Sequence, residues 1–549
     1  MPAKASPEPP SSIDIPPRLR TALPYLALAV AVLAAYANVY GNTFLLDDEQ
    51  WIVNNALLRH WDSIGAIFSS SSTAGVGGSD LFYRPLQQLI YLVIYQLAGI
   101  STFWFHVPNV VLHAANAGLL YALGKKLGFK PMAAFLGALL WALHPIQTEA
   151  VTYISATVEP LYAFFCLLGL CLLAPDFTPR KYLAVCPLLF LGLLSKETAV
   201  VLPLLAMACQ FLIDKGRLRA AAYFRTWPLW LTIAGYFLLR YLVLHNGDHF
   251  VFYKRQNLYT EHVLYRIYTF LATLPLYAKL ILWPSGLHMS HAFDVYVNFS
   301  EPAVLGGAAL MLATLAWIVK GRGKRGLPLG WGLLWFGFSY APVSGILVPL
   351  NALFLEHWMY LPTAGLFLGA AESIARWAES LPRKTAGRIA AGFAITAALA
   401  LGIKTHMQNT HWRDPITFYS YIVAQGTDSA AVYNNLGNAY LDNGEVGRAI
   451  PAFRKAITLY DHFAQTHHNL ALALLNLPDR KVHIPEAIAE LKRALAINPN
   501  FYQSCELLAN IYAYTGDRRD EAFYRVKDEA LRRKFHIPPN IYREPVLTP

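Results

Sequence analysis

Three successive carboxylates, Asp47, Asp48 and Glu49, follow an apolar run that ends near residue 40. Like charges in a row are costly at a membrane boundary unless a counter-ion or a substrate interacts with them. A carboxylate in this place can act as a general base that removes a proton from a hydroxyl group. A solvated acidic loop explains the same residues, so a chemical role depends on which other groups lie on that side of the membrane.

Further ionisable residues lie at the ends of other apolar runs, on the same predicted side. Arg84 precedes a helix-starting Pro85, and Lys196 lies in a break between two runs. Guanidinium and ammonium groups are suited to binding a phosphate. The other members of the set are His144, Glu149, Glu197, Glu356 and His357. Each residue alone fits a helix cap or a membrane-surface anchor, but together they predict a polar cavity that opens outward and acts as an active site.

The composition indicates which elements hold these groups, because 55% of the 549 residues are hydrophobic and only 14% are charged. These values are typical of a polytopic membrane protein. The sequence predicts an all-α fold, in which a transmembrane helix bundle of about eleven spans precedes an α-solenoid. The predicted spans are 22–40, 105–124, 131–145, 150–174, 182–195, 197–214, 227–244, 302–319, 329–349, 357–375 and 387–403.

The basic residues predict the orientation of the bundle. Lys and Arg gather in alternate loops, and a disordered tail at 1–21 lies on the same, cytoplasmic side. The outer loop 41–104 and the carboxylates are then non-cytoplasmic. This distribution accounts for the net charge of +11 without nucleic-acid binding. The five cysteines predict neither a disulfide framework nor a metal cluster. Clustered carboxylates could hold a divalent cation, but no ligand spacing demands one.

Two apolar segments fit the charge pattern only if they do not cross the membrane. We expect a re-entrant or interfacial segment within 245–301, because an extra span there would place the basic loop after residue 319 outside. The run 85–99 carries glutamines and tyrosines among its apolar residues, which favours an amphipathic helix at the interface. Both segments, together with the spans, belong to a transmembrane domain at 22–404.

The chain changes character after this domain and becomes polar and repetitive. Tyr433, Leu436, Gly437 and Tyr440 match the spacing of a tetratricopeptide repeat (TPR), a pair of packed helices. We expect a linker at 405–429, about three repeats at 430–535 and a tail at 536–549. A stack of such repeats usually binds a peptide or a partner protein on its concave face. A dimerisation or packing module is the alternative.

Six segments, in order, resemble the transmembrane and TPR-containing O-mannosyltransferases of the GT-C glycosyltransferase superfamily. They are Asp47-Asp48, Phe82-Tyr83-Arg84-Pro85-Leu86, His144-Pro145-Ile146-Gln147-Thr148-Glu149-Ala150, Ser195-Lys196-Glu197, Glu356-His357-Trp358-Met359-Tyr360-Leu361-Pro362 and Trp412-Arg413-Asp414. The resemblance covers nearly the whole chain. Eukaryotic members carry many more repeats, so a bacterial inner membrane with a periplasmic TPR domain is expected, or the endoplasmic reticulum with a lumenal TPR domain if the chain is eukaryotic.

The resemblance implies an inverting enzyme that moves a sugar from a polyprenyl-phosphate donor to a hydroxyl acceptor, expected to be a protein Ser or Thr. Asp47 and Asp48 would supply the general base, and Asp47 matches the first acid of the family motif. Arg84 and Lys196 would bind the donor phosphate. The residues His144, Glu149, Glu197, Glu356 and His357 would line the cavity. No nucleotide-binding motif is present in the sequence, which is consistent with a lipid-linked donor.

Two other functions remain open at this point. A non-catalytic membrane scaffold would use its repeats to recruit a partner protein while the membrane domain binds lipid. Such a scaffold would keep its function after loss of the carboxylates at positions 47 and 48. A flippase or transporter would need polar residues along a path across the membrane, whereas here the ionisable groups stay near one face.

Overall fold

The computed structural model describes residues 17–76, 82–217, 220–244, 257–291, 293–320, 326–381 and 385–535. Within these ranges the chain forms helices and loops and no strand. It divides into two compact units, one of residues 1–287 and 293–410 and one of residues 288–292 and 411–549. The predicted all-α class is confirmed. The predicted tails at 1–21 and 536–549 lie wholly or mostly outside the described residues.

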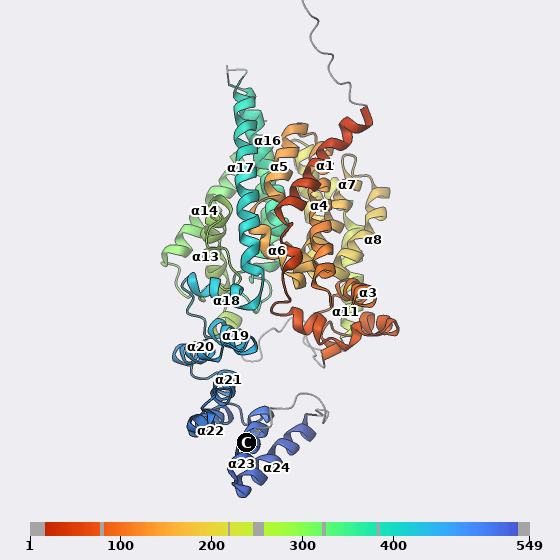
Figure 1. Ribbon diagram of the computed structural model, residues 1–549. Helices are drawn as coiled ribbons and strands as arrows, with labels where there is room; N and C mark the ends of the chain where they lie inside the picture. Colours follow the sequence, from red (N-terminus) through yellow and green to blue (C-terminus); the bar gives the residue numbers. More distant parts are fainter. Residues whose placement is uncertain are drawn as a thin grey trace, which may run out of the picture. The chain divides into compact units, whose positions relative to one another are not determined.

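The first unit is a bundle of apolar helices (Figure 1). Several begin with a proline in their first turn, where the missing N–H group has no intrahelical partner to lose. The α-helices are α1 (Pro17–Ala35), α2 (Ile64–Ser69), α3 (Pro85–Ala98), α4 (Thr102–Lys126), α5 (Pro131–Ala142), α6 (Thr148–Thr152), α7 (Val158–Leu173), α8 (Pro179–Ser195), α9 (Leu202–Ile213), α10 (Ala220–Phe224), α11 (Trp227–Val243), α12 (Leu258–Glu261), α13 (Val263–Leu282), α14 (Pro302–Lys320), α15 (Leu327–Tyr340), α16 (Tyr360–Glu379) and α17 (Ala386–Asn409).

Each of the predicted spans coincides with a helix, but the helices are often shorter than the apolar runs. The run 150–174 is broken before α7, and the run 329–349 stops being α-helical at Tyr340. Among the described residues, four helices are long and apolar enough to cross a membrane by length and composition: Leu19–Gly41, Ile154–Leu173, Pro302–Lys320 and Ala386–Trp412. The number of spans therefore stays a prediction.

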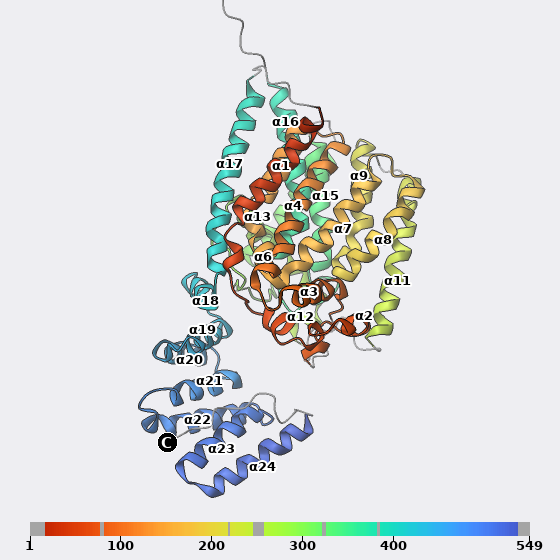
Figure 2. The same cartoon turned by 45° about the vertical axis from the view of Figure 1, so that its right-hand side comes forward.

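The two segments predicted to avoid crossing the membrane are both helical. Residues 263–282 form the single continuous helix α13, which packs against α14. The run 85–99 forms α3, whose glutamines Gln87 and Gln88 are buried. Figure 2 shows α2 and α3 together at one end of the bundle. Their predicted position at the membrane interface stays a prediction.

Close packing at the centre of the bundle depends on small residues and on one shared tyrosine. A Cβ atom on Gly365 of α16 would lie 2.2 Å from the ring of Trp335 on α15, so only glycine fits there. The Tyr360 hydroxyl lies 2.8 Å from His113 Nδ1 and accepts a hydrogen bond from the Asn116 amide, while its carbonyl accepts one from Trp141. Tyr360 thus joins α4, α5 and α16, and it directly follows the short helix Glu356–Met359.

The second unit is a stack of helix pairs. It contains α18 (Pro415–Ala424), α19 (Ala430–Asp442), α20 (Val446–Leu459), α21 (Ala464–Leu475), α22 (Arg480–Ile497), α23 (Tyr502–Thr515) and α24 (Arg518–Lys534). The last six helices form three pairs, as the repeats predicted. Much of the predicted linker 405–429 is helical, because α17 extends to Asn409 and α18 follows.

The residues that signalled the repeats have packing roles. A Cβ atom on Gly437 would lie 2.6 Å from the ring of Phe453, so glycine lets α19 and α20 approach closely. Leu436 and Tyr440 are buried in the same unit, and Tyr433 is half-buried. The Tyr440 hydroxyl also accepts a hydrogen bond of 2.6 Å from Arg448.

Candidate active site

The two aspartates that follow the first helix have different environments. Asp48 is buried, and its carboxylate accepts hydrogen bonds of 2.9 Å from the N–H groups of Leu45 and Ser155 and a further one from the Ser155 hydroxyl. Asp47 is exposed, and its N–H group donates to the Tyr153 hydroxyl at 3.0 Å. Asp48 therefore anchors the loop to the segment before α7, while the Asp47 side chain is presented at the surface.

The burial of Asp48 has a consequence for the pH dependence of stability. Burial raises the pKa of Asp48 to about 7, although the hydrogen bonds from Ser155 and Leu45 oppose the increase. Because this pKa lies above the unfolded value of about 3.9, folding favours the protonated form. Stability from this group is fully present below about pH 4 and is lost as the pH rises through about 7.

We therefore expect the thermal midpoint of the wild-type protein to fall between pH 5 and about pH 8 more steeply than that of Asp48→Asn. The measurement is thermal unfolding of both proteins in detergent across this range. Glu49→Gln, which changes an exposed carboxylate, is the matched control and should follow the wild type. Parallel curves for the wild type and Asp48→Asn would contradict the expectation.

Lys196 lies in the break between α8 and the short helix at Glu197–Val201, as the sequence predicted for a boundary residue. It is 6% exposed, and its ammonium group forms an ion pair with Glu159, which is 1% exposed. Burial and the neighbouring Arg84 lower the pKa of Lys196, and Glu159 opposes this change. Glu159 lies four residues after Ser155, so this ion pair is one turn away from the anchor of Asp48.

Glu149 and His357 form a second pair next to the first. One oxygen of the Glu149 carboxylate lies 2.6 Å from His357 Nδ1, and the other accepts the N–H groups of Glu356 and His357 at 3.0 and 3.3 Å. Burial alone would raise the pKa of Glu149, but His357 and these N–H groups hold it below its usual value. His357 Nε2 lies 3.7 Å from Glu159, which connects the two pairs. Glu356 is buried beside them.

Arg84 approaches the same cluster from the start of α3. Its Nε atom lies 4.0 Å from Glu197, and its guanidinium group lies 4.4 and 5.6 Å from the ring centres of Phe82 and Trp51. The backbone N–H group of Arg84 donates to the Ser72 hydroxyl at 2.9 Å. These contacts link the segments that carry Asp48, Arg84, Lys196 and His357, which are far apart in the sequence.

One predicted residue also caps a helix, and three participants were missed. The ring nitrogens of His144 lie 3.2 and 2.9 Å from the N–H group of Ile146 and the carbonyl of Ile281, so this histidine caps a helix. Sequence reasoning missed Tyr153 and Ser155, which give no signal in an apolar run. It also missed Arg240 of α11, which forms an ion pair with Glu197. Arg240 was detectable as the only charged residue within 227–244.

No group of three or more His, Cys, Asp or Glu side chains within the described residues could hold a metal ion. The carboxylates of the cluster are instead occupied by cationic side chains and N–H groups. The arrangement offers an exposed carboxylate and a group of cations at one end of the bundle. It can deprotonate a hydroxyl and bind an anion.

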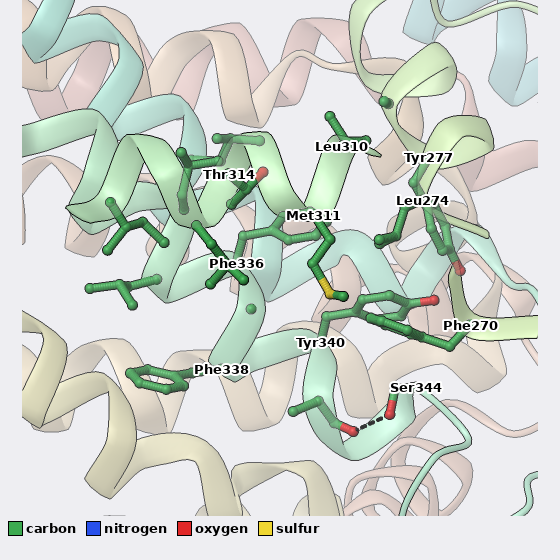
Figure 3. Close-up of a pocket in the computed structure, with 18 of the residues that line it drawn as sticks. Phe270, Leu274, Tyr277, Leu310, Met311, Thr314, Phe336, Phe338, Tyr340 and Ser344 are labelled. Carbon is green, nitrogen blue, oxygen red and sulfur yellow. Dashed lines mark hydrogen bonds between the residues drawn. The ribbon is translucent and has the colours of Figure 1, made fainter. Parts of the chain in front are cut away.

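An apolar cavity of about 500 Å³ lies between α13, α14 and α15. Figure 3 shows Leu274, Met311 and Phe336 pointing into it, with the hydroxyl groups of Tyr277 and Tyr340 among the few polar atoms. The Tyr277 hydroxyl donates to the Leu355 carbonyl at 2.9 Å. Leu355 directly precedes Glu356, so a wall of the cavity is bonded to the segment that holds Glu149.

Comparison with known proteins supports the predicted resemblance. The tetratricopeptide repeat model matches residues 430–463. A protein O-mannosyl-transferase of Caenorhabditis elegans is 26% identical over 80% of this chain and 63% of its own length. The protein O-mannosyl-transferase Tmtc3 of Drosophila melanogaster is 23% identical over 96% of this chain and 66% of its own length. The chain therefore spans slightly less than two thirds of these relatives.

Among solved structures, ArnT from Cupriavidus metallidurans bound to undecaprenyl phosphate is 15% identical, with a TM-score of 0.36 over 89% of this chain and 81% of that chain. This likeness is too loose to support an argument about the site. The sequence relatives confirm the predicted similarity to the TPR-containing O-mannosyltransferases.

Proposed function

We propose that this protein is an inverting glycosyltransferase that moves a sugar from a polyprenyl-phosphate donor to a hydroxyl acceptor of a protein Ser or Thr. The observation that carries the proposal is that the loop of the exposed carboxylate Asp47 is bonded through Asp48 to Ser155, one turn before Glu159, which pairs with Lys196. The similarity to protein O-mannosyl-transferases supports the same reaction class.

In the proposed reaction, the Asp47 carboxylate removes the proton of the acceptor hydroxyl while its oxygen attacks the anomeric carbon of the sugar. The bond between that carbon and the phosphate oxygen breaks, and the polyprenyl phosphate leaves with the electron pair. Arg84 and Lys196 stabilise the negative charge of the leaving phosphate. Only one carboxylate acts on the reacting atoms, and a single displacement inverts the anomeric centre.

Asp48 has a positioning role in this proposal. Its hydrogen bonds to Leu45 and Ser155 fix the backbone on which Asp47 is carried. The repeats bind the acceptor or a partner protein on the non-cytoplasmic side of the membrane. A bacterial inner membrane with periplasmic repeats is the proposed location, with the endoplasmic reticulum and lumenal repeats as the eukaryotic equivalent.

The test uses purified protein in lipid with a panel of polyprenyl-phosphate sugars and measures the release of polyprenyl phosphate. Release that requires an acceptor peptide and the Asp47 carboxylate would support the transferase and identify its donor. Saturable lipid binding without release from any donor, in the presence of an acceptor extract, would favour the membrane scaffold instead.

We further propose that the apolar cavity accommodates the donor's polyprenyl chain near its phosphate. The cavity is bonded through Tyr277 to Leu355, which precedes the Glu356–His357 segment of the site. An isoprenoid chain is apolar throughout, so it matches a wall of leucine, isoleucine and aromatic side chains. In this proposal, the tail and the phosphate of one molecule lie at neighbouring positions.

Gly337 lines the cavity, and a Cβ atom there would meet no atom within 4 Å, so Gly337→Leu should fill part of the open volume. We expect the KM for a long-chain donor to rise by about tenfold, an effect of about 1.4 kcal/mol, and the KM for a donor with one or two isoprene units to change little. Gly392→Leu, at another open helical position on α17, is the control. Equal effects on long and short donors would place the tail elsewhere.

A further inference from the structure

Arg240 is a buried cation that the proposed reaction does not yet use. It lies near the end of α11 and is 2% exposed. It is the only charged residue in its apolar run. A charged side chain within a membrane-spanning segment is costly, and it usually pairs with another group or contributes to a functional pathway. Arg240 Nη1 donates a hydrogen bond to the Glu197 carboxylate.

Glu197 is shared between two guanidinium groups. Arg240 contacts one carboxylate oxygen, and Arg84 Nε lies 4.0 Å from the other. Two cations and one carboxylate leave this triad with one net positive charge. Lys196 does not change the count, because Glu159 balances it in an ion pair of its own. Without Arg240, the remaining pair of Arg84 and Glu197 would be neutral.

Arg84 also has hydrogen-bonding capacity to spare. Its Nε atom is buried and has no hydrogen-bond partner within the described part of the chain. The aromatic rings of Phe82 and Trp51 attract the guanidinium group but accept no strong hydrogen bond from it. A buried N–H donor without an acceptor is costly, so this position is suited to an oxygen of a bound anion.

The helix that carries Arg240 also contacts the segment that carries Arg84. The ring of Tyr236, one turn before Arg240, lies 6.5 Å from the ring of Tyr83. The Tyr83 hydroxyl in turn donates to the Phe68 carbonyl at 2.8 Å. Contacts through Tyr83 and through Glu197 therefore hold Arg84 in place relative to α11.

We infer that Arg240 is a positioning residue that keeps the Arg84 site cationic, so that Arg84 binds the phosphate of an anionic polyprenyl lipid while it lies beside Glu197. This inference rests on the proposed function for the identity of the lipid. It adds a residue from α11 to the donor site. Glu197 then holds two guanidinium groups together while its single negative charge neutralises only one of them.

The test compares the binding of a short-chain polyprenyl phosphate with that of the matched polyprenol, for the full-length protein in detergent. Arg240→Gln should weaken binding of the phosphate by about tenfold, which corresponds to about 1.4 kcal/mol, and leave polyprenol binding unchanged. Arg240→Lys should retain more of the phosphate affinity than Arg240→Gln. Arg376→Gln removes a guanidinium group from an ion pair with Glu372 on α16 and is the matched control, with no change expected.

A double variant separates an electrostatic role from a structural one. Arg240→Gln with Glu197→Gln leaves Arg84 as the only charge of the triad and restores one net positive charge. Phosphate binding should then recover toward the wild-type value, although the contact between the two positions is weakened. If the double variant binds the phosphate as weakly as Arg240→Gln, or if folded Arg240→Gln binds it like the wild type, the inference is wrong.

Arg240→Gln alone leaves Glu197 with a weaker counter-charge. If this variant is too unstable to purify, the double variant is compared with Glu197→Gln, whose triad carries two net positive charges. About tenfold weaker phosphate binding by the double variant is expected, and equal binding would overturn the inference. A different result would contradict the proposed function alone. In that case the wild type binds polyprenyl phosphate in an Arg240-dependent way but releases no polyprenyl phosphate from any sugar donor. A wild type that does not prefer the phosphate to the polyprenol would overturn the inference itself.

Discussion

Asp47→Asn is expected to reduce the release of polyprenyl phosphate from a sugar donor by about 10²- to 10⁴-fold, because the acceptor hydroxyl then loses its general base. Asparagine is nearly the same size as aspartate but cannot take up the proton. Asp47 is exposed, so the substitution should leave the thermal midpoint almost unchanged. The measurement is the initial rate of release in lipid at saturating donor and acceptor.

Glu49→Gln is the matched control for this result, because it removes an exposed carboxylate two residues away. It should keep nearly all of the activity. Asp48→Asn should have an intermediate effect, since its side chain acts through the backbone of the loop and through Ser155. An equal loss of rate in Glu49→Gln and Asp47→Asn would mean that loop charge matters and that no single carboxylate is the base.

Lys196→Met is expected to have the largest effect on stability. It removes the ammonium partner of the Glu159 carboxylate, which is 1% exposed, and leaves His357 Nε2 beside it at 3.7 Å. Breaking a buried ion pair from one side costs about 3–5 kcal/mol, because the remaining charge is desolvated and uncompensated. The expected result is a large fall in the thermal midpoint in detergent, together with loss of transfer activity.

The double variant Lys196→Met with Glu159→Gln removes both charges and should recover most of the stability. It should not recover the affinity for the donor, because methionine has no N–H group to donate a hydrogen bond to the phosphate. Lys181→Met is the control, because its pair with Asp176 is largely exposed and should change stability by less than about 1 kcal/mol. A double variant as unstable as Lys196→Met would show that packing, and not the unpaired charge, causes the loss.

The sequence predicted the elements of this fold better than their exact ends. Apolar runs identified the helices of the bundle because membrane helices need long apolar surfaces, and Gly437 identified the repeats because only glycine allows the close approach of Phe453. The break before α7 was not predictable. Residues 150–157 contain no charged residue, proline or glycine that would signal a break, and their irregular backbone is stabilised by contacts such as the one from Ser155 to Asp48.

The site was predictable where charge interrupts an apolar run and was not predictable where neutral groups position that charge. Lys196 and Glu197 were visible as charged residues between two runs. The pairing of Lys196 with Glu159 was not visible, since Glu159 lies on α7 and Lys196 lies 37 positions later, in the break after α8. His144 was expected in the cavity because it is ionisable and lies at a helix end; its ring also caps a helix, and its place in the cavity stays a prediction.

The Tyr360 contacts described above bear on which parts of the molecule can move during a reaction cycle. Hydrogen bonds with His113, Asn116 and Trp141 converge on this tyrosine, so α4, α5 and α16 cannot slide past one another without breaking several of them. The Glu356–His357 segment directly precedes Tyr360 and shares this rigid base. Under the proposed function, this segment should therefore stay in place while substrates enter and leave, and any movement should involve elements that Tyr360 does not join.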